Sequence, residues 1–418
     1  MWATMAFCFI FEFPSICRYN LLFFQNGDLK NTEKLIFRHY HEEVQTPLHR
    51  IAFAYYSSLK SNDTLNKIKN STFTSDIDSC SHLSPHIVLI IGESYNKHHS
   101  TLYGYQQPTT PLQQKRKGEG ELFLFSDVVT PWNITSNAFL DVFSMWEYGN
   151  DKPIGDYPLF PFLFRKAGYF VSFFSNQYLL RGFRRGATNQ AGHFFLADRA
   201  LSDSLFDHRN EKSFKYDMSL IGQIKKYKKY DEQRKYTLDI VHLIGQHFDY
   251  EQRYPQHEAY FSKLDYESRN LSKDAKRIIM HYDNATRYND IVLDSLISLY
   301  ERDEAIIVFL SDHGEEVYDG LPVHGRLFQK PTKEQARQEF EIPMWIWCSK
   351  QYQAKHPELV ARIKESTHKA FMSDGLPQLL LDLAGISAQW VDTAKDLLSP
   401  NYKAKRRIIG GEVYYDEL

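Results

Sequence analysis

The sequence predicts an α/β fold in which a doubly wound, mostly parallel sheet has helices on both faces. The first observation is a set of short apolar runs rich in β-branched and aromatic residues, which is typical of buried parallel strands. The second is that helical patterns separate these runs, and such alternation favours a doubly wound sheet. The runs are residues 86–94, 169–177, 236–247 and 305–314, and the clearest helical stretches are residues 158–168 and 274–303.

A helical segment is expected before this domain. Apolar residues recur at three- and four-residue spacing between residues 28 and 70. Residues 61–85 are rich in Ser, Asn, Asp and Thr and are expected to form a linker, with the domain boundary between residues 70 and 84. The expected units are residues 1–25, a helical linker segment at 26–84, and a catalytic domain at 85–418.

The first 24 residues are the most apolar stretch of the chain. Glu12, Pro14 and Arg18 interrupt this stretch, so its longest unbroken part is shorter than a membrane-spanning helix requires. It also lacks the basic start and the small-residue cleavage site of a signal peptide. Three interpretations are open: the end of a membrane helix, an interfacial helix or a buried core helix. We favour the first two.

The overall charge and the cysteines exclude several classes of protein. Lys and Arg together number 50 and Asp and Glu number 52, which gives a formal charge of −2. Since there is also no long basic run, nucleic acid is not expected to be the main partner. The cysteines are scattered without a CxxC pair, so they indicate neither a zinc knuckle nor a disulfide framework. They are Cys8, Cys17, Cys80 and Cys348.

Metal-capable side chains stand at the ends of three of the apolar runs. Glu93, His247 and the pair Asp312-His313 occupy these positions. Ligands of open α/β sheets bind at the carboxyl ends of the strands, so these residues are expected to converge. Zinc accepts such a mixture of nitrogen and oxygen ligands. The alternative for Asp312 is a helix N-cap, with Glu315 three residues further on.

Thr135 is the candidate nucleophile because it comes just before a helical pattern. The N-terminus of a helix favours a phosphate group, and a metal bound to the hydroxyl would lower its pKa. The alternatives are that Thr135 is an ordinary N-cap or that the neighbouring Ser136 serves instead. His247 and His324 precede polar or turn-like residues, so both are expected near the surface.

Several ordered motifs resemble those of the phosphoethanolamine transferases, which are members of the alkaline phosphatase superfamily. The resemblance implies that Glu93, Asp312 and His313 bind zinc together with Thr135, which accepts phosphoethanolamine. It also implies that His247 and His324 line the donor phosphate or a second metal position. The motifs are VLIIGESYNKHHSTLYGYQQPTTP, TPWNITSNAFLDVFS, FFSNQ, HLIGQHFDYEQRYP, YDNATRYNDIVLDSLI, FLSDHGEEV, VHG and EIPMWIW.

The resemblance further implies a location, a donor and an acceptor. In the family this domain faces the periplasm, follows membrane helices of the bacterial inner membrane, and works at the membrane surface. The donor is phosphatidylethanolamine, and the acceptor is lipid A, a core sugar of lipopolysaccharide or another envelope glycan. The helix after Thr135 has no cysteine, which favours the cysteine-poor branch of the family over the branch that modifies lipid A.

Other functions remain open at this point. A phosphoglycerol transferase or a hydrolase of the phosphodiesterase or sulfatase type could use the same Glu, Thr, Asp and His. A sulfatase needs a Cys or Ser in a C/S-x-P-x-R motif, and the chain has none. The alternative from a different class is a non-catalytic module that binds an envelope glycan or lipid. A complete nucleophile-plus-metal set argues against that module.

Overall fold

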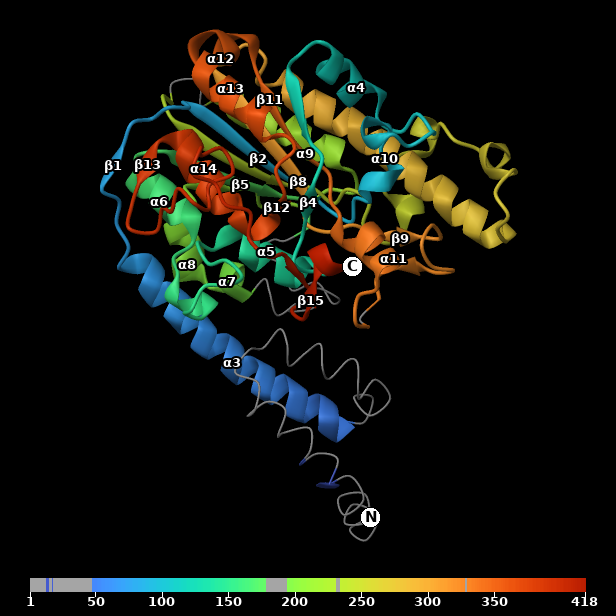
Figure 1. Cartoon of the computed structure of the whole chain (residues 1–418), viewed down its shortest axis with the longest axis horizontal. Coiled ribbons are helices and arrows are strands. Elements are labelled where there is room, and N and C mark those ends of the chain that lie inside the picture. The colour runs from blue at the N-terminus through green and yellow to red at the C-terminus, as the bar shows by residue number, and fades with distance from the viewer. Residues whose placement is uncertain (1–12, 15–16, 18–46, 178–193, 231–233, 328) are drawn as a thin grey trace.

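The computed structural model describes residues 13–14, 17, 47–177, 194–230, 234–327 and 329–418. Within these residues the central element is a seven-stranded sheet (Figure 1) in the order β3-β11-β8-β2-β7-β5-β6. Strand β11 is antiparallel to both of its neighbours, and the other pairs are parallel. The predicted doubly wound, mostly parallel sheet is therefore confirmed. Its strands are β2 (His86–Gly92), β3 (Leu122–Phe125), β5 (Phe170–Ser175), β6 (His208–Arg209), β7 (Thr237–His242), β8 (Ala305–Ser311) and β11 (Met344–Cys348).

Helices cover both faces of the sheet, and this explains the unbroken apolar runs. Along β2, Ile87, Leu89 and Ile91 belong to one hydrophobic cluster, whereas Val88 and Ile90 belong to the other. Because alternate side chains point to opposite faces, both sets must be apolar. The first face is covered by α5 (Thr135–Phe143), α6 (Phe160–Lys166), α13 (Pro357–Ser366) and α14 (Leu376–Ala384), and the second by α9 (Asp217–Tyr230) and α10 (Lys273–Ser298).

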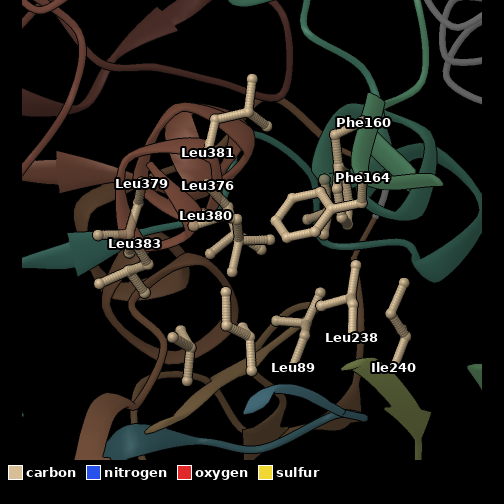
Figure 2. Close-up of a cluster of buried hydrophobic side chains, with 14 of the residues drawn as sticks. Leu89, Phe160, Phe164, Leu238, Ile240, Leu376, Leu379, Leu380, Leu381 and Leu383 are labelled. Carbon is tan, nitrogen blue, oxygen red and sulfur yellow. The ribbon is translucent and has the colours of Figure 1, made fainter. Parts of the chain in front are cut away.

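The leucine-rich helix α14 and the aromatic helix α6 form the packing layer over the first face. Figure 2 shows leucines of α14 and Phe160 and Phe164 of α6 above Leu89, Leu238 and Ile240 of the sheet. All of these side chains are fully buried. A layer of this kind holds the strand ends at fixed positions, since well-packed cores transmit displacement rather than absorb it.

Short helices and two-stranded ribbons complete the described domain. The ribbons pair β1 (Ser79–Cys80) with β13 (Ile386–Ser387), β4 (Val128–Val129) with β12 (Phe371–Met372), β9 (Glu316–Val317) with β10 (His324–Gly325), and β14 (Ile408–Ile409) with β15 (Val413–Tyr414). The remaining helices are α3 (Pro47–Phe73), α4 (Pro111–Gly118), α7 (Phe194–Ala197), α8 (Arg199–Leu205), α11 (Lys333–Gln335) and α12 (Lys350–Lys355).

Strand β7 is shorter than the predicted run at residues 236–247. It ends at His242, so the prediction that His247 terminates a strand is wrong. The cause is a long-range contact, because the Asp217 carboxylate accepts hydrogen bonds from the backbone N–H groups of Ile244 (3.0 Å) and Gly245 (2.9 Å). These bonds turn the chain out of the sheet, and Gly245 takes a positive φ of 45° in the turn.

Helix α3 extends into the predicted linker. It continues to Phe73, so the helical pattern predicted to residue 70 is confirmed for residues 47–70, and the Ser- and Asn-rich start of the expected linker is helical as well. Tertiary contacts override the weak local propensity here, since Ile68 is fully buried and the Ser71 hydroxyl lies 3.0 and 2.9 Å from the carbonyl oxygens of Gly155 and Tyr157. The predicted membrane or interfacial segment at 1–25 lies outside the described residues, apart from residues 13, 14 and 17. No helix in the described part of the chain combines the length and the apolarity needed to cross a membrane.

Candidate active site and metal centre

Two neighbouring parallel strands carry the first site residues to the same edge of the sheet. In the register of β2 and β8, Gly92 pairs with Ser311, so Glu93 and Asp312 follow side by side. The N–H of Asp312 donates to the carbonyl oxygen of Gly92 at 3.1 Å. A Cβ atom at Gly92 would lie 3.1 Å from the Phe309 ring, which explains a small residue at this strand end.

Glu93, Asp312 and His313 form a buried cluster of ligand-type atoms. One atom from each side chain lies within 4.8 Å of the others. His313 Nε2 is 3.4 Å from Glu93 Oε1 and 3.3 Å from Asp312 Oδ2, and all three side chains are shielded from solvent. The structure therefore brings together the three predicted ligands, two of them more than 200 residues from the first. The chain continues from this pair into β9, so the alternative that Asp312 starts a helix is wrong.

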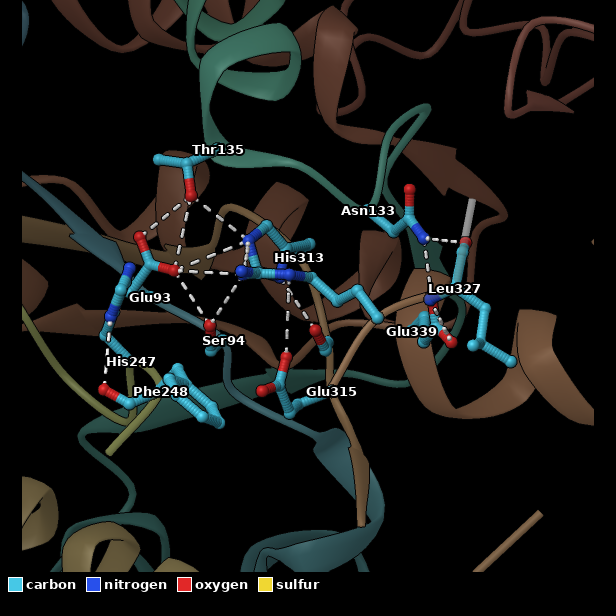
Figure 3. A network of polar contacts seen from close by, with 12 residues as sticks. Glu93, Ser94, Asn133, Thr135, His247, Phe248, His313, Glu315, Leu327 and Glu339 are labelled. Atoms are coloured by element: carbon cyan, nitrogen blue, oxygen red, sulfur yellow. Dashed lines mark hydrogen bonds and ion pairs between the residues drawn. The ribbon is translucent and has the colours of Figure 1, made fainter. Parts of the chain in front are cut away.

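Thr135 points its hydroxyl into this cluster (Figure 3). Its Oγ1 lies 3.0 Å and 3.2 Å from the two carboxylate oxygens of Glu93 and 3.1 Å from His313 Nε2. Thr135 is the first residue of α5, and Ile134 occupies the N-cap position. The alternative of an ordinary threonine N-cap is therefore wrong. The geometry places a hydroxyl both at a helix N-terminus and among metal-type ligands.

The hydrogen bonds of His313 fix which ring nitrogen faces the cluster. Nδ1 lies 2.7 Å from the carbonyl oxygen of Gly314, which can only accept, so Nδ1 carries the proton. Nε2 is then left with its lone pair, which faces the hydroxyl of Thr135 and Nη1 of Arg326 beside the carboxylates. Burial, together with the charge of Arg326, lowers the pKa of His313 and keeps the ring neutral. A neutral imidazole with an oriented lone pair is the form that binds a metal.

The donor set fits a divalent cation of the zinc type. Asp312 Oδ2 is buried and accepts no hydrogen bond within the described structure. Burial and the neighbouring Glu93 charge raise the pKa of Asp312 well above its usual range, because two carboxylates share a buried site. A cation would offset this repulsion. Two carboxylates, one imidazole and a hydroxyl give the mixed oxygen and nitrogen set that tetrahedral zinc accepts.

Two further site residues escaped the sequence reasoning, Arg326 and Gln177. The Nη1 atom of Arg326 lies 2.9 Å from His313 Nε2 and 3.2 Å from Ser94 Oγ. Gln177 donates from Nε2 to Glu93 Oε2 at 2.8 Å. A signal for Gln177 exists in the sequence, since it follows the end of β5 at the same edge of the sheet.

His247 and His324 are connected through Phe248, which follows His247 in the chain and stacks on His324. Both are half-buried. Burial raises the pKa of Glu93, but the contacts with His313 and, after them, the charge of His247 outweigh it and lower this pKa well below its usual range. The ring of Phe248 stacks on His324 with centroids 6.1 Å apart, and His324 Nδ1 is 3.1 Å from the Tyr318 hydroxyl. Burial lowers the pKa of His324.

Comparison with known proteins identifies the family to which the chain belongs. The sulfatase family matches residues 85–386 of the chain. Phosphoethanolamine transferase EptC of Escherichia coli K12 is 29% identical over 330 residues, which cover 78% of this chain and 55% of that protein. Phosphoethanolamine transferase EptA of Helicobacter pylori is 30% identical over 283 residues, covering 66% and 50% respectively. The chain thus spans about half the length of these curated relatives.

Solved structures of phosphoethanolamine transferases have a similar fold. The zinc complex of the C-terminal periplasmic domain of EptC from Escherichia coli has a TM-score of 0.68 at 25% identity, covering 82% of this chain and 95% of that one. The integral membrane protein EptA of Neisseria meningitidis has a TM-score of 0.58 at 18% identity, covering 88% and 69%, so its likeness shows the fold alone.

Fold, site and family match together define the class: the chain belongs to the sulfatase family of α/β enzymes. Within this family its curated relatives include phosphoethanolamine transferases. The resemblance predicted from the sequence motifs is therefore confirmed.

Proposed function

We propose that this chain transfers phosphoethanolamine from phosphatidylethanolamine to an envelope glycan through a phosphothreonine intermediate at Thr135. The observation that carries the proposal is the Thr135 hydroxyl, which lies within hydrogen-bond distance of Glu93 and of the His313 lone pair. A hydroxyl held only for structure has no need of a carboxylate–imidazole cluster. The names of the relatives support this transferase activity.

In the proposal zinc is held by Glu93, Asp312 and His313, with Thr135 as the fourth ligand. Zinc would lower the pKa of the threonine hydroxyl and stabilise negative charge on the transferring phosphoryl group. Arg326 carries a further positive charge at the same place, 3.6 Å from Glu93 Oε1. Its fixed N–H groups are suited to phosphate oxygens. A relative with bound zinc supports the choice of metal.

The first half-reaction forms one bond to phosphorus and breaks another. Thr135 Oγ1 attacks in line, and the bond between phosphorus and the diacylglycerol oxygen breaks. The hydroxyl proton, which in the resting structure faces Glu93 Oε2, passes to His247 or His324 and then to the departing diacylglycerol oxygen. In the second half-reaction an acceptor oxygen attacks phosphorus, the bond to Thr135 breaks, and the acceptor's proton returns to Thr135 by the same histidine.

The proposed acceptor is a core sugar of lipopolysaccharide, lipid A or another envelope glycan. The proposed place of reaction is the periplasmic face of a bacterial inner membrane, where the donor lipid is available. Relatives named as transferases to Kdo(2)-lipid A support an acceptor of this class. The relatives crystallised as periplasmic domains support the location.

The donor half-reaction provides the test. Purified protein is incubated with fluorescent phosphatidylethanolamine in detergent, and the release of fluorescent diacylglycerol is followed with and without a chelator. Thr135→Ala is expected to abolish release, and mass spectrometry is expected to find a phosphoethanolamine adduct on Thr135 of the wild type only. Full release by Thr135→Ala would refute the proposal.

The matched control is Ser136→Ala, because Ser136 is the neighbouring buried hydroxyl on the same helix. This variant is expected to keep the activity, which excludes the alternative that Ser136 is the nucleophile. Phosphatidylglycerol, offered as a second donor, distinguishes a phosphoethanolamine transferase from a phosphoglycerol transferase. Release from that lipid and none from phosphatidylethanolamine would assign the chain to that activity instead.

A further inference from the structure

A short segment outside the ligand set contacts the backbone stretches that carry Glu93, Thr135 and His313 and the stretch that carries Arg326. This bracing segment, Gln335–Glu341, includes one π-helical turn at Ala336–Phe340. Turns of this kind are rare and are frequently found at functional sites. Glu339, the fourth of the five residues of this turn, is fully buried. The proposed mechanism gives none of these residues a role.

The carboxylate of Glu339 holds two of the site-bearing loops (Figure 3). Its Oε2 accepts hydrogen bonds from Asn133 Nδ2 at 2.5 Å and from the backbone N–H of Leu327 at 3.2 Å. Asn133 precedes Thr135 by two residues, and Leu327 directly follows Arg326. A third bond, from Gln335 Nε2 at 3.1 Å, fixes the carboxylate to its own segment.

The backbone of Glu339 holds a third stretch, the one that carries Asp312 and His313. The carbonyl oxygen of Glu339 accepts a hydrogen bond from the N–H of Gly314 at 2.9 Å, one residue beyond the predicted ligand His313. A Cβ atom at Gly314 would lie 2.2 Å from the carbonyl oxygen of Gln338, so the two segments are in close backbone contact. Glu339 therefore touches the neighbours of the nucleophile, of a ligand and of the site arginine.

The bracing segment also reaches the stretch that follows Glu93. Gln338 Oε1 accepts from Asn96 Nδ2 at 2.8 Å, and Glu341 forms an ion pair with Lys97 at 3.0 Å. These contacts come from residues on either side of Glu339. All stretches that carry predicted catalytic or ligand residues from β2, β8 and α5 thus converge on one turn.

We infer that Glu339 is a positioning residue that sets the distance between the Thr135 hydroxyl and the metal ligands. It acts through Asn133, Leu327 and Gly314, and it touches none of the reacting groups itself. Each partner of its carboxylate is an N–H donor, so the site needs an acceptor there. This inference rests on the proposed function, because it assigns a task within the same site.

The test compares Glu339→Ala, Asn133→Ala and the double variant in the diacylglycerol-release assay. Each single variant is expected to lower kcat about 10- to 100-fold, since a misplacement of about 1 Å can cost that much. KM, zinc content and the melting temperature are expected to stay close to the wild-type values. The double variant is expected to be no worse than the poorer single variant, because both changes remove the same contact. The inference would be overturned if the two single-variant losses in kcat multiplied in the double variant. It would also be overturned if the losses in kcat only followed a loss of zinc or unfolding.

Two further variants and a second measurement complete the test. Glu339→Gln keeps one acceptor oxygen for Asn133 and is expected to recover most of kcat, whereas loss equal to that of Glu339→Ala would count against the inference. Arg337→Gln, at an exposed position on the same turn, is the matched control and is expected to be unchanged. Hydrogen–deuterium exchange of Glu339→Ala is expected to rise in residues 130–137 and 312–327 and not in α10. If hydrogen–deuterium exchange rises uniformly or does not change, the inference about Glu339 is overturned. If the wild type releases no diacylglycerol, only the proposed function is refuted, and the exchange measurement still tests the role of Glu339.

Discussion

Replacement of His99 by Gln is expected to remove a pH-dependent part of the stability. The buried His99 ring lies 2.5 Å through Nδ1 from Asp283 and 2.5 Å through Nε2 from Asp319. Burial alone would lower the pKa of His99, but the charges of Asp283 and Asp319 outweigh it and raise the pKa from 6.5 to about 10. Asp283 lies on α10, and Asp319 lies between β9 and β10, so this imidazolium joins the long helix to the ribbon that carries His324.

The sign of the effect follows from the raised pKa. Below pH 6.5 both the folded and the unfolded chain bind the proton, so the stabilisation is fully present. As the pH rises toward about 10, only the folded chain keeps the proton, and the stabilisation is progressively lost. One bound proton changes the free energy of unfolding by about 1.4 kcal/mol per pH unit. The expected loss between pH 6.5 and about pH 9 is therefore about 3 kcal/mol.

Urea unfolding followed by tryptophan fluorescence at several pH values measures this effect. The difference in unfolding free energy between the wild type and His99→Gln is expected to be largest at pH 6.5 or below and to shrink toward about pH 9. Taking the difference cancels the titration of other buried groups. His257→Gln is the control, because the His257 side chain is 80% exposed. A difference that stays constant with pH would refute the reasoning.

Two further predictions concern the metal centre and its backbone. Zinc added to chelated protein is expected to raise the melting temperature, because a hundredfold excess over Kd stabilises the folded state by about 2.7 kcal/mol. Differential scanning fluorimetry checks this, and no shift with wild type, or an equal shift with Asp312→Ala, would contradict it. Gly314→Ala is expected to lose several-fold or more of its zinc affinity and several °C of melting temperature, since its Cβ would lie 2.2 Å from the carbonyl oxygen of Gln338. Isothermal titration calorimetry measures the zinc affinity. If the variant binds zinc as tightly as the wild type, the prediction is wrong, because the backbone near Gln338 then moves aside without displacing His313.

Much of the fold and the convergence of the buried cluster could be predicted from local sequence. Strand ends depend on short apolar runs, and the carboxyl ends of parallel strands share one edge, so the convergence of Glu93, Asp312 and His313 follows from the sequence pattern alone. The position of Thr135 at a helix start is also predictable, but the direction of its side chain is not. That direction depends on how α5 packs on the sheet, where Phe139 and Phe143 are fully buried.

The missed features depend on contacts between residues far apart in the chain. The end of β7 depends on Asp217, and the last turns of α3 depend on the burial of Ile68. Arg326 and Glu339 are ordinary charged residues in the sequence. They gain their importance only when folded loops place them beside the site, so neither periodicity nor spacing could distinguish them from surface charges.

The way helix α3 is attached has a mechanical consequence. Its last turns are fixed to the domain by Ile68 and Ser71, while the rest of the helix projects away from the sheet (Figure 1). A helix of 27 residues is about 40 Å long, so it acts as a stiff lever with its pivot at Ser71. The Pro47 end lies about 36 Å from this pivot, so a rotation of about 10° would move it by about 6 Å. The Pro47 end would thus sweep a wide arc for small angular changes at Ser71, while its distance from this pivot stays constant.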